Sequence, residues 1–573
     1  MNKNLSTQLQ RLEACRRCYG PGCASRVERL LASFQGARFS DATSLARFHD
    51  TLLFLRAFPQ SAKVVRLTEA LLGKIASQVA RLRESGADLS LFDDEQFSGV
   101  AGTTIRDTFT YEVARWLTQR HPQQVAVDWN LDEQARQIAV ALPQIVPLLA
   151  DDSLVEADTP LLDWLAAAAG GANKILPWLM DRLEQAPGTT LQNTAWYDAL
   201  KIAIDWELGD SPASRTRARR NPSAMYYHRK PLIQRNQVSL AEELQSSPLN
   251  VRRLSPAESS KLLDMVREAL TVRYRELWGT TRGDPATVVE AHVGRGVHIF
   301  LWGLPPDRRL PLRAYYAGIT FKNGVPINYV EGISLFEWME VGFNTYYTFR
   351  DGETAWIYSK VLHFLHQQTG VTTISVYPYQ IGHDNEEAIK SGAFWFYRKL
   401  GFRPGRRELL ALTEREEARM KRDPSHRTSA STLRKLAEHH VFYEFGTGAK
   451  ELWDMFSTRN IGLAVQLRMA AKFAGDPEKM RSAATADLSQ ALRVDLATWS
   501  PLERSAFEQF ALVMALVPEF KGWNDAKKRA LTEIIRAKVL PEEAEYLRRL
   551  QKHDALKQPF LRLGSYPTPG RSS

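Results

Sequence analysis

Hydrophobic residues between positions 24 and 207 recur at helical spacing. Within residues 42–55, Leu45, Phe48 and Leu52 follow one another at intervals of three and four, which lines one face of a helix. Residues 64–82 repeat this pattern, and later helices are expected to begin or break near prolines, at Pro143, Pro147, Pro160 and Pro177. The pattern predicts a helical domain over residues 1–210.

Residues 248–408 show short β-rich runs between turn residues instead. Ser255, Pro256 and Glu258 form a helix-start signature: an N-cap serine, a proline in the first turn and a glutamate three residues after the cap. The Asn323-Gly324 pair between two β-rich runs predicts a tight hairpin. The expected strands cover residues 250–254, 297–304, 312–321, 325–335 and 339–349. Their short connections predict antiparallel pairing.

The order then changes to strand, helix, strand. Residues 355–367 carry an apolar helical stripe, Thr369-Gly370 ends it, and residues 371–377 form the next strand candidate. Such a unit makes its two strands parallel neighbours with a right-handed crossover. A further helix over residues 385–400 is expected to end at Gly401, which suits the left-handed position after a helix.

Two other segments complete the chain. Residues 211–235 contain seven Lys or Arg, three Pro and no acid, so residues 211–247 are predicted to be an exposed basic linker. Tyr226 and Tyr227 would suit base stacking, but a solvated connector is the favoured interpretation. Residues 409–573 are predicted to be helical, with a disordered tail over residues 565–573, which are rich in Pro, Gly and Ser.

Composition limits the classes of protein to consider. The 573 residues are 44% apolar, enough for more than one core. The net charge of +10 favours acidic partners, such as an acidic carrier protein. Nucleic acid is not the expected partner, because no helix-turn-helix, zinc-finger or RNA-binding signature occurs. The sequence contains neither a signal-peptide pattern nor an apolar run of membrane-spanning length, so we expect no membrane span and a cytoplasmic location.

All three cysteines lie near the start, at Cys15, Cys18 and Cys23. An odd count in a chain of this length argues against a disulfide framework. The spacing could begin a metal site, but no fourth ligand lies nearby, so we expect reduced thiols and no metal.

The end of the 385–400 helix carries a family resemblance. Ala393, then Tyr397 four residues later, then Gly401-Phe402 four residues after the tyrosine, resembles the closing motif of the GNAT acyltransferase superfamily. The hairpin and the strand–helix–strand unit before it are similar to that family's core. The resemblance covers residues 248–408 and implies an α+β fold, with a central GNAT-like mixed sheet and helices flanked by N-terminal and C-terminal all-α regions.

The resemblance also implies a binding site for the co-substrate, acyl-CoA or acetyl-CoA. In this family two parallel strands splay apart around a pantetheine arm, and the loop before the central helix presents its amides to the pyrophosphate. By position that loop is Arg350, Gly352, Thr354 and Ala355, while Asn344 and Thr345 would hold the thioester and pantetheine amides. The loop departs from the family's spacing, and Asp351 and Glu353 add negative charge to it. A longer connection, residues 378–384, adds His383 and Asp384 near the substrate side.

The same resemblance implies the catalytic groups. Tyr397 would donate to the leaving thiolate. The general base for the amine would lie on a strand before Arg350, with Glu340 the first candidate and Glu331 the second. Each has an ordinary structural role as an alternative: core packing for Tyr397, and an outward strand position for either glutamate.

The sequence therefore predicts an N-acyltransferase that moves an acyl group from an acyl-CoA or acyl-carrier-protein thioester to a small-molecule or peptide amine. Two alternatives remain within the same fold. One is a GNAT-like domain used only for binding, which the altered phosphate loop would suit. The other is a transferase that uses aminoacyl-tRNA.

Overall fold

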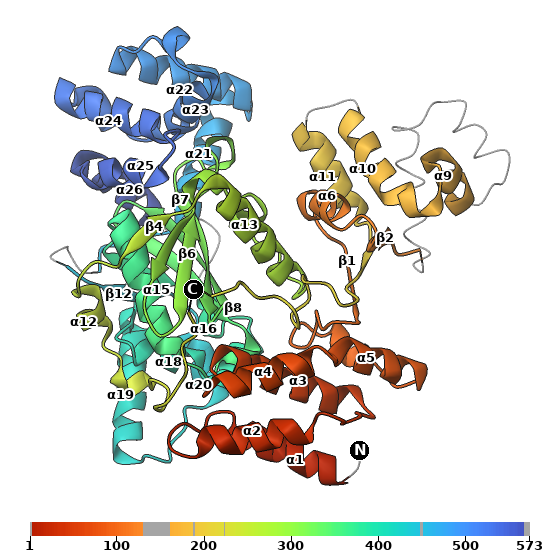
Figure 1. The fold of residues 1–573 in the computed structure, drawn as a ribbon. Helices are drawn as coiled ribbons and strands as arrows, with labels where there is room; N and C mark the ends of the chain where they lie inside the picture. The colour runs from red at the N-terminus through yellow and green to blue at the C-terminus, as the bar shows by residue number, and fades with distance from the viewer. Residues whose placement is uncertain (1–2, 130–160, 187–189, 223, 447–450, 566–573) are drawn as a thin grey trace.

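The computed structural model describes residues 3–129, 161–186, 190–222, 224–446 and 451–565. A nine-stranded mixed sheet with many surrounding helices confirms the α+β class in its coarse form (Figure 1). The expected proline breaks at Pro143, Pro147 and Pro160, and the tail beyond residue 565, lie outside the described residues.

The large sheet has the strand order β11-β12-β10-β9-β8-β7-β6-β5-β4. Its strands are β4 (Val251–Arg253), β5 (Val289–His292), β6 (Val297–Trp302), β7 (Ala314–Lys322), β8 (Val325–Leu335), β9 (Trp338–Thr345), β10 (Thr373–Val376), β11 (Arg403–Pro404) and β12 (Val441–Glu444). All neighbours are antiparallel except β9 and β10, which are parallel as the sequence predicts. The hairpin at Asn323-Gly324 is also confirmed, with both residues at positive φ and Lys322 paired to Val325.

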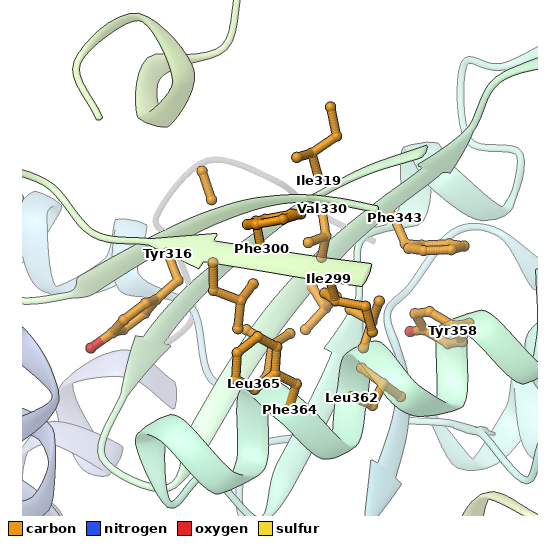
Figure 2. Close-up of a cluster of buried hydrophobic side chains, with 14 of the residues drawn as sticks. Ile299, Phe300, Tyr316, Ile319, Val330, Phe343, Tyr358, Leu362, Phe364 and Leu365 are labelled. Atoms are coloured by element: carbon orange, nitrogen blue, oxygen red, sulfur yellow. The ribbon is translucent and has the colours of Figure 1, made fainter. Parts of the chain in front are cut away.

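Helices cover both faces of this sheet. The crossover helix α15 (Thr354–Thr369) lies against one face, where Tyr358, Leu362 and Leu365 meet side chains such as Ile299 and Phe343 (Figure 2). The other face carries α13 (Pro256–Thr271) and α14 (Trp278–Thr281); α13 begins with the predicted capping box. The apolar residues of both layers belong to one continuous core.

The sheet continues beyond the expected boundary at residue 408. After α19 (Arg407–Arg422) and α20 (Ala430–Leu436), strand β12 inserts between β10 and β11. The prediction that residues 409–573 are all helical is therefore wrong at β12, whose four residues are too short to show a period. Six further helices follow: α21 (Thr458–Phe473), α22 (Pro477–Leu492), α23 (Pro501–Met514), α24 (Asp525–Ala537), α25 (Glu543–Gln551) and α26 (Asp554–Ser565).

The helix expected over residues 385–400 is instead two short helices. They are α17 (Glu386–Ser391) and α18 (Ala393–Arg398), and a four-residue helix, α16 (Pro378–Ile381), precedes them. Gly392, at φ 66°, is the left-handed residue that ends α17 and precedes α18. Gly401 is left-handed as expected, with φ 103°.

The N-terminal region differs from the prediction in two respects. Helices α1 (Lys3–Cys15), α2 (Cys23–Ser33), α3 (Ala42–Ala57), α4 (Ala62–Leu72) and α5 (Ile75–Glu84) contribute to the same core as the large sheet. The described residues between 104 and 208 build a second core beside it (Figure 1) around a three-stranded sheet, so the all-helical expectation is wrong there. Its elements are β1 (Thr104–Asp107), α6 (Tyr111–Arg120), β2 (Val125–Val127), α9 (Leu161–Ala169), α10 (Ile175–Gln185), α11 (Thr190–Leu200) and β3 (Ile204–Glu207).

Cys18 and Cys23 form a disulfide, which corrects the expectation of three reduced thiols. The turn between α1 and α2 brings their Cα atoms to 5.7 Å, the separation that a disulfide requires. Cys15 is free and buried in the core. An odd number of cysteines did not exclude a local pair.

The basic segment 211–247 is not the exposed linker that its composition predicts. Ser214, Arg215 and Thr216 are buried, and the segment ends in a short helix, α12 (Leu240–Leu244). The backbone N–H of Arg220 donates to the carbonyl of Gly324 at 2.8 Å, so the segment packs against the β7–β8 hairpin. Its arginines find carboxylates and carbonyls that lie far away in the sequence, which composition cannot show.

No helix among the described residues is long and apolar enough to cross a membrane.

The contact between this basic segment and the hairpin can be tested at Gly324. A Cβ there would lie 1.8 Å from the carbonyl oxygen of Arg220, whereas a Cβ at Gly294, also at positive φ, would meet nothing within 4 Å. Both Ala substitutions incur the left-handed backbone cost of ~1–2 kcal/mol. We expect Gly324→Ala to lower the free energy of unfolding in urea by a further ~2 kcal/mol or more relative to Gly294→Ala. Equal losses would show that the segment does not press on the hairpin.

Candidate functional site

The parallel strands β9 and β10 separate after a short paired stretch. Their register pairs Trp338 with Thr373, Met339 with Ile374 and Glu340 with Ser375, and then stops. Strand β9 continues to Thr345, while β10 ends at Val376. The edge of β9 that faces β10 is therefore not paired with that strand beyond Glu340. An extended ligand that carries amides could hydrogen-bond to such an edge.

The side chain of Gln380, from α16, lies in this opening. Its Oε1 accepts from the backbone N–H of Phe343 and from the hydroxyl of Tyr397, both at 3.3 Å. Its Nε2 lies 2.8 Å from the point that a Cβ on Gly342 would occupy, so the missing side chain makes room for the amide. Gln380 thus uses a backbone donor of β9 as the amide of a ligand would.

Tyr397 approaches the opening from α18. Its ring packs against Tyr358 and Phe402, with ring centroids 5.8 and 5.6 Å apart, and the side chain is buried. Burial raises the pKa of its hydroxyl above the ordinary range, so the group stays protonated. A protonated phenol in this position can donate a hydrogen bond into the opening.

Glu340 and Glu331 lie on the other face of the sheet, opposite α15. Glu331 on β8 stands opposite Gly342 on β9, two residues beyond Glu340 along the same face. Glu340 pairs with Nε2 of His440 at 2.8 Å. Glu331 accepts a hydrogen bond from the hydroxyl of Tyr315, and burial raises its pKa to about 7. A pKa of about 7 suits a general base near neutral pH.

Asn344 and Thr345 lie at the end of β9. The side-chain amide of Asn344 donates to the hydroxyl of Tyr329 at 3.1 Å. The carbonyl of Thr345 accepts from Nε of Arg350 at 3.2 Å. The buried hydroxyl of Thr345 has no hydrogen-bond partner among the described residues.

The predicted phosphate loop is covered by the N-terminal helices. A Cβ on Gly352 would lie 2.6 Å from the ring of Phe58, the residue that follows α3. Asp351 pairs with Arg16 at 2.8 Å and with Arg17 at 3.2 Å. Arg350 is engaged by Glu387 and lies over the ring of Tyr347.

The N-terminus of α15 already has an anion of its own. Glu353, fully buried, accepts from the backbone N–H of Ile233 at 3.1 Å and pairs with Lys322 and Arg295. Burial lowers the pKa of Lys322 to about 7, against the opposing effect of Glu353. Thr354 donates to the carbonyl of Arg350, and Ala355 is buried in the first turn of α15. In this arrangement charged groups of the protein itself surround the N-terminus of α15.

Three features of the site were missed or misjudged from the sequence. Gln380 lies in the long connection after β10, whose length was the available signal, but His383 and Asp384 there are exposed instead of lining the opening. His440 meets Glu340 across 100 residues of sequence, so no local pattern could pair them.

No cluster of three or more His, Cys, Asp or Glu suited to a metal occurs within the described ranges.

A further polar pocket of about 450 Å³ lies near β4, β5 and β6. Its acid, Glu290, accepts from Arg220 at 3.0 Å, from His298 at 2.9 Å and from Arg252 at 2.5 Å. These donors lower the pKa of Glu290 to about 2 although burial opposes them. The charged groups of this pocket thus satisfy one another.

The raised pKa of Glu331 makes stability depend on pH. The folded protein holds this proton up to about pH 7, whereas the unfolded chain releases it near pH ~4.3. Between these values the folded state binds more protons, so the free energy of unfolding falls as pH rises. We expect the wild type to lose up to ~3 kcal/mol relative to Glu331→Gln between about pH 5 and pH 8 in urea titrations. A difference that does not change with pH would contradict this assignment.

Comparisons of the chain with protein-family models, curated proteins and solved structures find no match. The conclusions about this site therefore rest on its geometry.

Proposed function

We propose that the protein is an N-acyltransferase that moves an acyl group from a thioester to an amine. The observation that supports this most is the opening between β9 and β10, which has a backbone edge for an extended arm. The buried hydroxyl of Tyr397 reaches it from one side. Glu331, with a pKa of about 7, lies on the opposite face of the sheet next to the same stretch of β9.

Each group has a defined part in the reaction. Glu331 takes a proton from the incoming ammonium group, which frees the nitrogen lone pair. The nitrogen attacks the thioester carbonyl carbon, a C–N bond forms, and the C–S bond breaks. Tyr397 donates a hydrogen bond to the departing sulfur, which becomes a thiol by taking up the second proton that the nitrogen loses as the amide forms. Glu340 with His440 is the alternative base, and the pH profile of turnover distinguishes the two.

The contacts of loop 350–355 favour one type of acyl donor. Phe58 packs closely against Gly352, and Asp351 and Glu353 add negative charge beside it, which disfavours a bound diphosphate at this loop. A carrier protein presents its thioester on a phosphopantetheine arm that lacks the adenosine diphosphate portion, and the net charge of +10 suits an acidic carrier. We therefore favour a carrier-bound thioester over free acyl-CoA.

Tyr397→Phe tests the chemistry. Removal of the hydroxyl takes away stabilisation of the leaving sulfur, so kcat should fall by ~10²-fold while the KM for the donor stays the same. Tyr358→Phe is the matched control, because Tyr358 is equally buried, is also aromatic and lies 5.8 Å away between ring centroids. An equal fall in kcat for both variants would show that Tyr397 acts only through its packing in the core.

Gln380→Ala tests the binding site. Loss of the side chain frees the N–H of Phe343 for the donor, so an acyl carrier protein should raise Tm more in this variant than in the wild type. The screen includes acetyl-CoA, long-chain acyl-CoA and acyl carrier protein. A Tm shift with acyl-CoA and none with acyl carrier protein would show that the donor is a coenzyme A thioester. If no thioester donor binds either protein, the domain is a binding module instead of an enzyme.

A further inference from the structure

Three arginines gather where the N-terminal helices meet the end of β9. Arg215 comes from the basic segment, whereas Arg273 and Arg275 follow the C-terminus of α13. With Tyr346 and Asn344 they line a small pocket, which Glu95 and Gln96 close from the N-terminal side. With Tyr329 of β8, segments from five parts of the chain converge on this one point.

The positive charges in this pocket exceed the negative ones. Arg215 lies 3.6 Å from Asp50, and Arg275 pairs with Glu95. Arg273 forms no ion pair with any carboxylate among the described residues, although it is only 5% exposed. Burial and the charge of Arg215 lower the pKa of Arg273 to about 9, which still leaves it charged at neutral pH. The charge of Asp50 opposes this shift without forming an ion pair with Arg273. A buried cation that is only partly compensated is costly, so its retention calls for a reason.

Hydrogen-bond donors in the pocket are also unused. The Nε atoms of Arg215 and Arg273 and the hydroxyl of Tyr346 are buried and have no partner within the described residues. Native proteins leave few such groups unsatisfied, and a bound anion would satisfy these. The pocket at Glu290 differs, because there Arg220 pairs with Glu290 and Arg252 pairs with both Glu290 and Glu258.

Structural contacts explain only in part why Arg273 is buried. Its Nη1 donates to the carbonyl of Ala269 in the last turn of α13, where a cation is favourable. Its guanidinium also lies 4.0 Å from the ring centroid of Tyr346. Neither contact neutralises the charge or uses Nε.

The pocket adjoins the proposed acceptor side. Tyr329, which lines it, and Glu331 point to the same face of β8 two residues apart, a spacing of ~7 Å along a strand. The space inside is about 20 Å³, which holds one or two oxygen atoms on the scale where a water needs ~10–15 Å³. The size suits the end of a carboxylate better than a phosphate.

From these observations we infer that the arginine pocket binds a carboxylate of the amine acceptor. The acceptor is then a peptide or an ω-amino acid, because an α-amino acid, whose amine and carboxylate share one carbon, cannot span from Glu331 to Arg273. This inference rests on the proposed acyl transfer for the identity of the acceptor, but anion binding itself can be measured without turnover.

The test is a thermal-shift titration without donor at constant ionic strength. Its probes are glutarate, ε-aminocaproate, hexylamine and inorganic phosphate. Wild type should gain several degrees in Tm with glutarate and ε-aminocaproate, and none with hexylamine. Arg273→Met should keep or raise the Tm of the free protein, because it removes an unpaired buried charge, and should lose the ligand-induced shift. Arg267→Met is the matched control, since Arg267 lies on α13 with Asp264 and carbonyl partners, and it should keep the shift.

Each outcome decides the assignment. The inference is overturned if wild type shows no shift with either carboxylate, if Arg273→Met keeps it, or if phosphate alone produces it. Should Arg273→Met fail to fold, Arg275→Gln must weaken glutarate binding about tenfold for the inference to stand. A carboxylate shift that depends on Arg273, in a protein that acylates no amine, would support the anion site and reject the proposed function.

Discussion

The parallel pairing of β9 with β10 is the constraint on which the rest of the site depends. Two consecutive parallel strands need a crossover, and α15 provides it by packing its apolar side chains beneath the sheet. Because α15 must start beside the end of β9, its N-terminus is forced close to the opening between the strands. The N-terminal helices then cover this terminus, with Phe58 against Gly352. The opening and the closed loop therefore share one cause.

The buried charges on one side of β9 form ion pairs, whereas a buried charge on the other side does not. At the start of α15, Glu353 meets Lys322 and Arg295, and the helix N-terminus has a permanent anion from the protein itself. At the end of α13, Arg273 forms no ion pair among the described residues, although the charge of Asp50 acts on it from farther away. Because low-dielectric surroundings penalise an unpaired ion far more than a paired one, the first cluster is complete and the second is not. The arginine pocket, proposed above to bind a carboxylate, therefore differs from loop 350–355, whose charges the protein itself pairs.

Local signals predicted the elements that local interactions determine. The Ser255–Glu258 capping box, the Asn323-Gly324 turn and the strand–helix–strand order all depend on residues within a few positions of one another. The predictions were wrong where contacts between residues far apart in the sequence determine the structure. Strand β12 is stabilised by β10 and β11, the basic segment by the hairpin and N-terminal helices, and the Cys18–Cys23 pair by a turn that composition does not indicate.

The sequence by itself determined the central β-rich region, its parallel pair, and the place of Tyr397 near the end of the core. It also brought Glu331 and Glu340 into consideration, since both lie on strands that the pattern identifies. Only the tertiary structure decided that burial raises the pKa of Glu331, that Gln380 occupies the opening, and that the buried Nε of Arg273 has no hydrogen-bond partner in the part of the chain that is described. The reason is physical: pKa values, buried charges and strand edges depend on what packs around a residue, and those neighbours come from segments that lie up to hundreds of residues away.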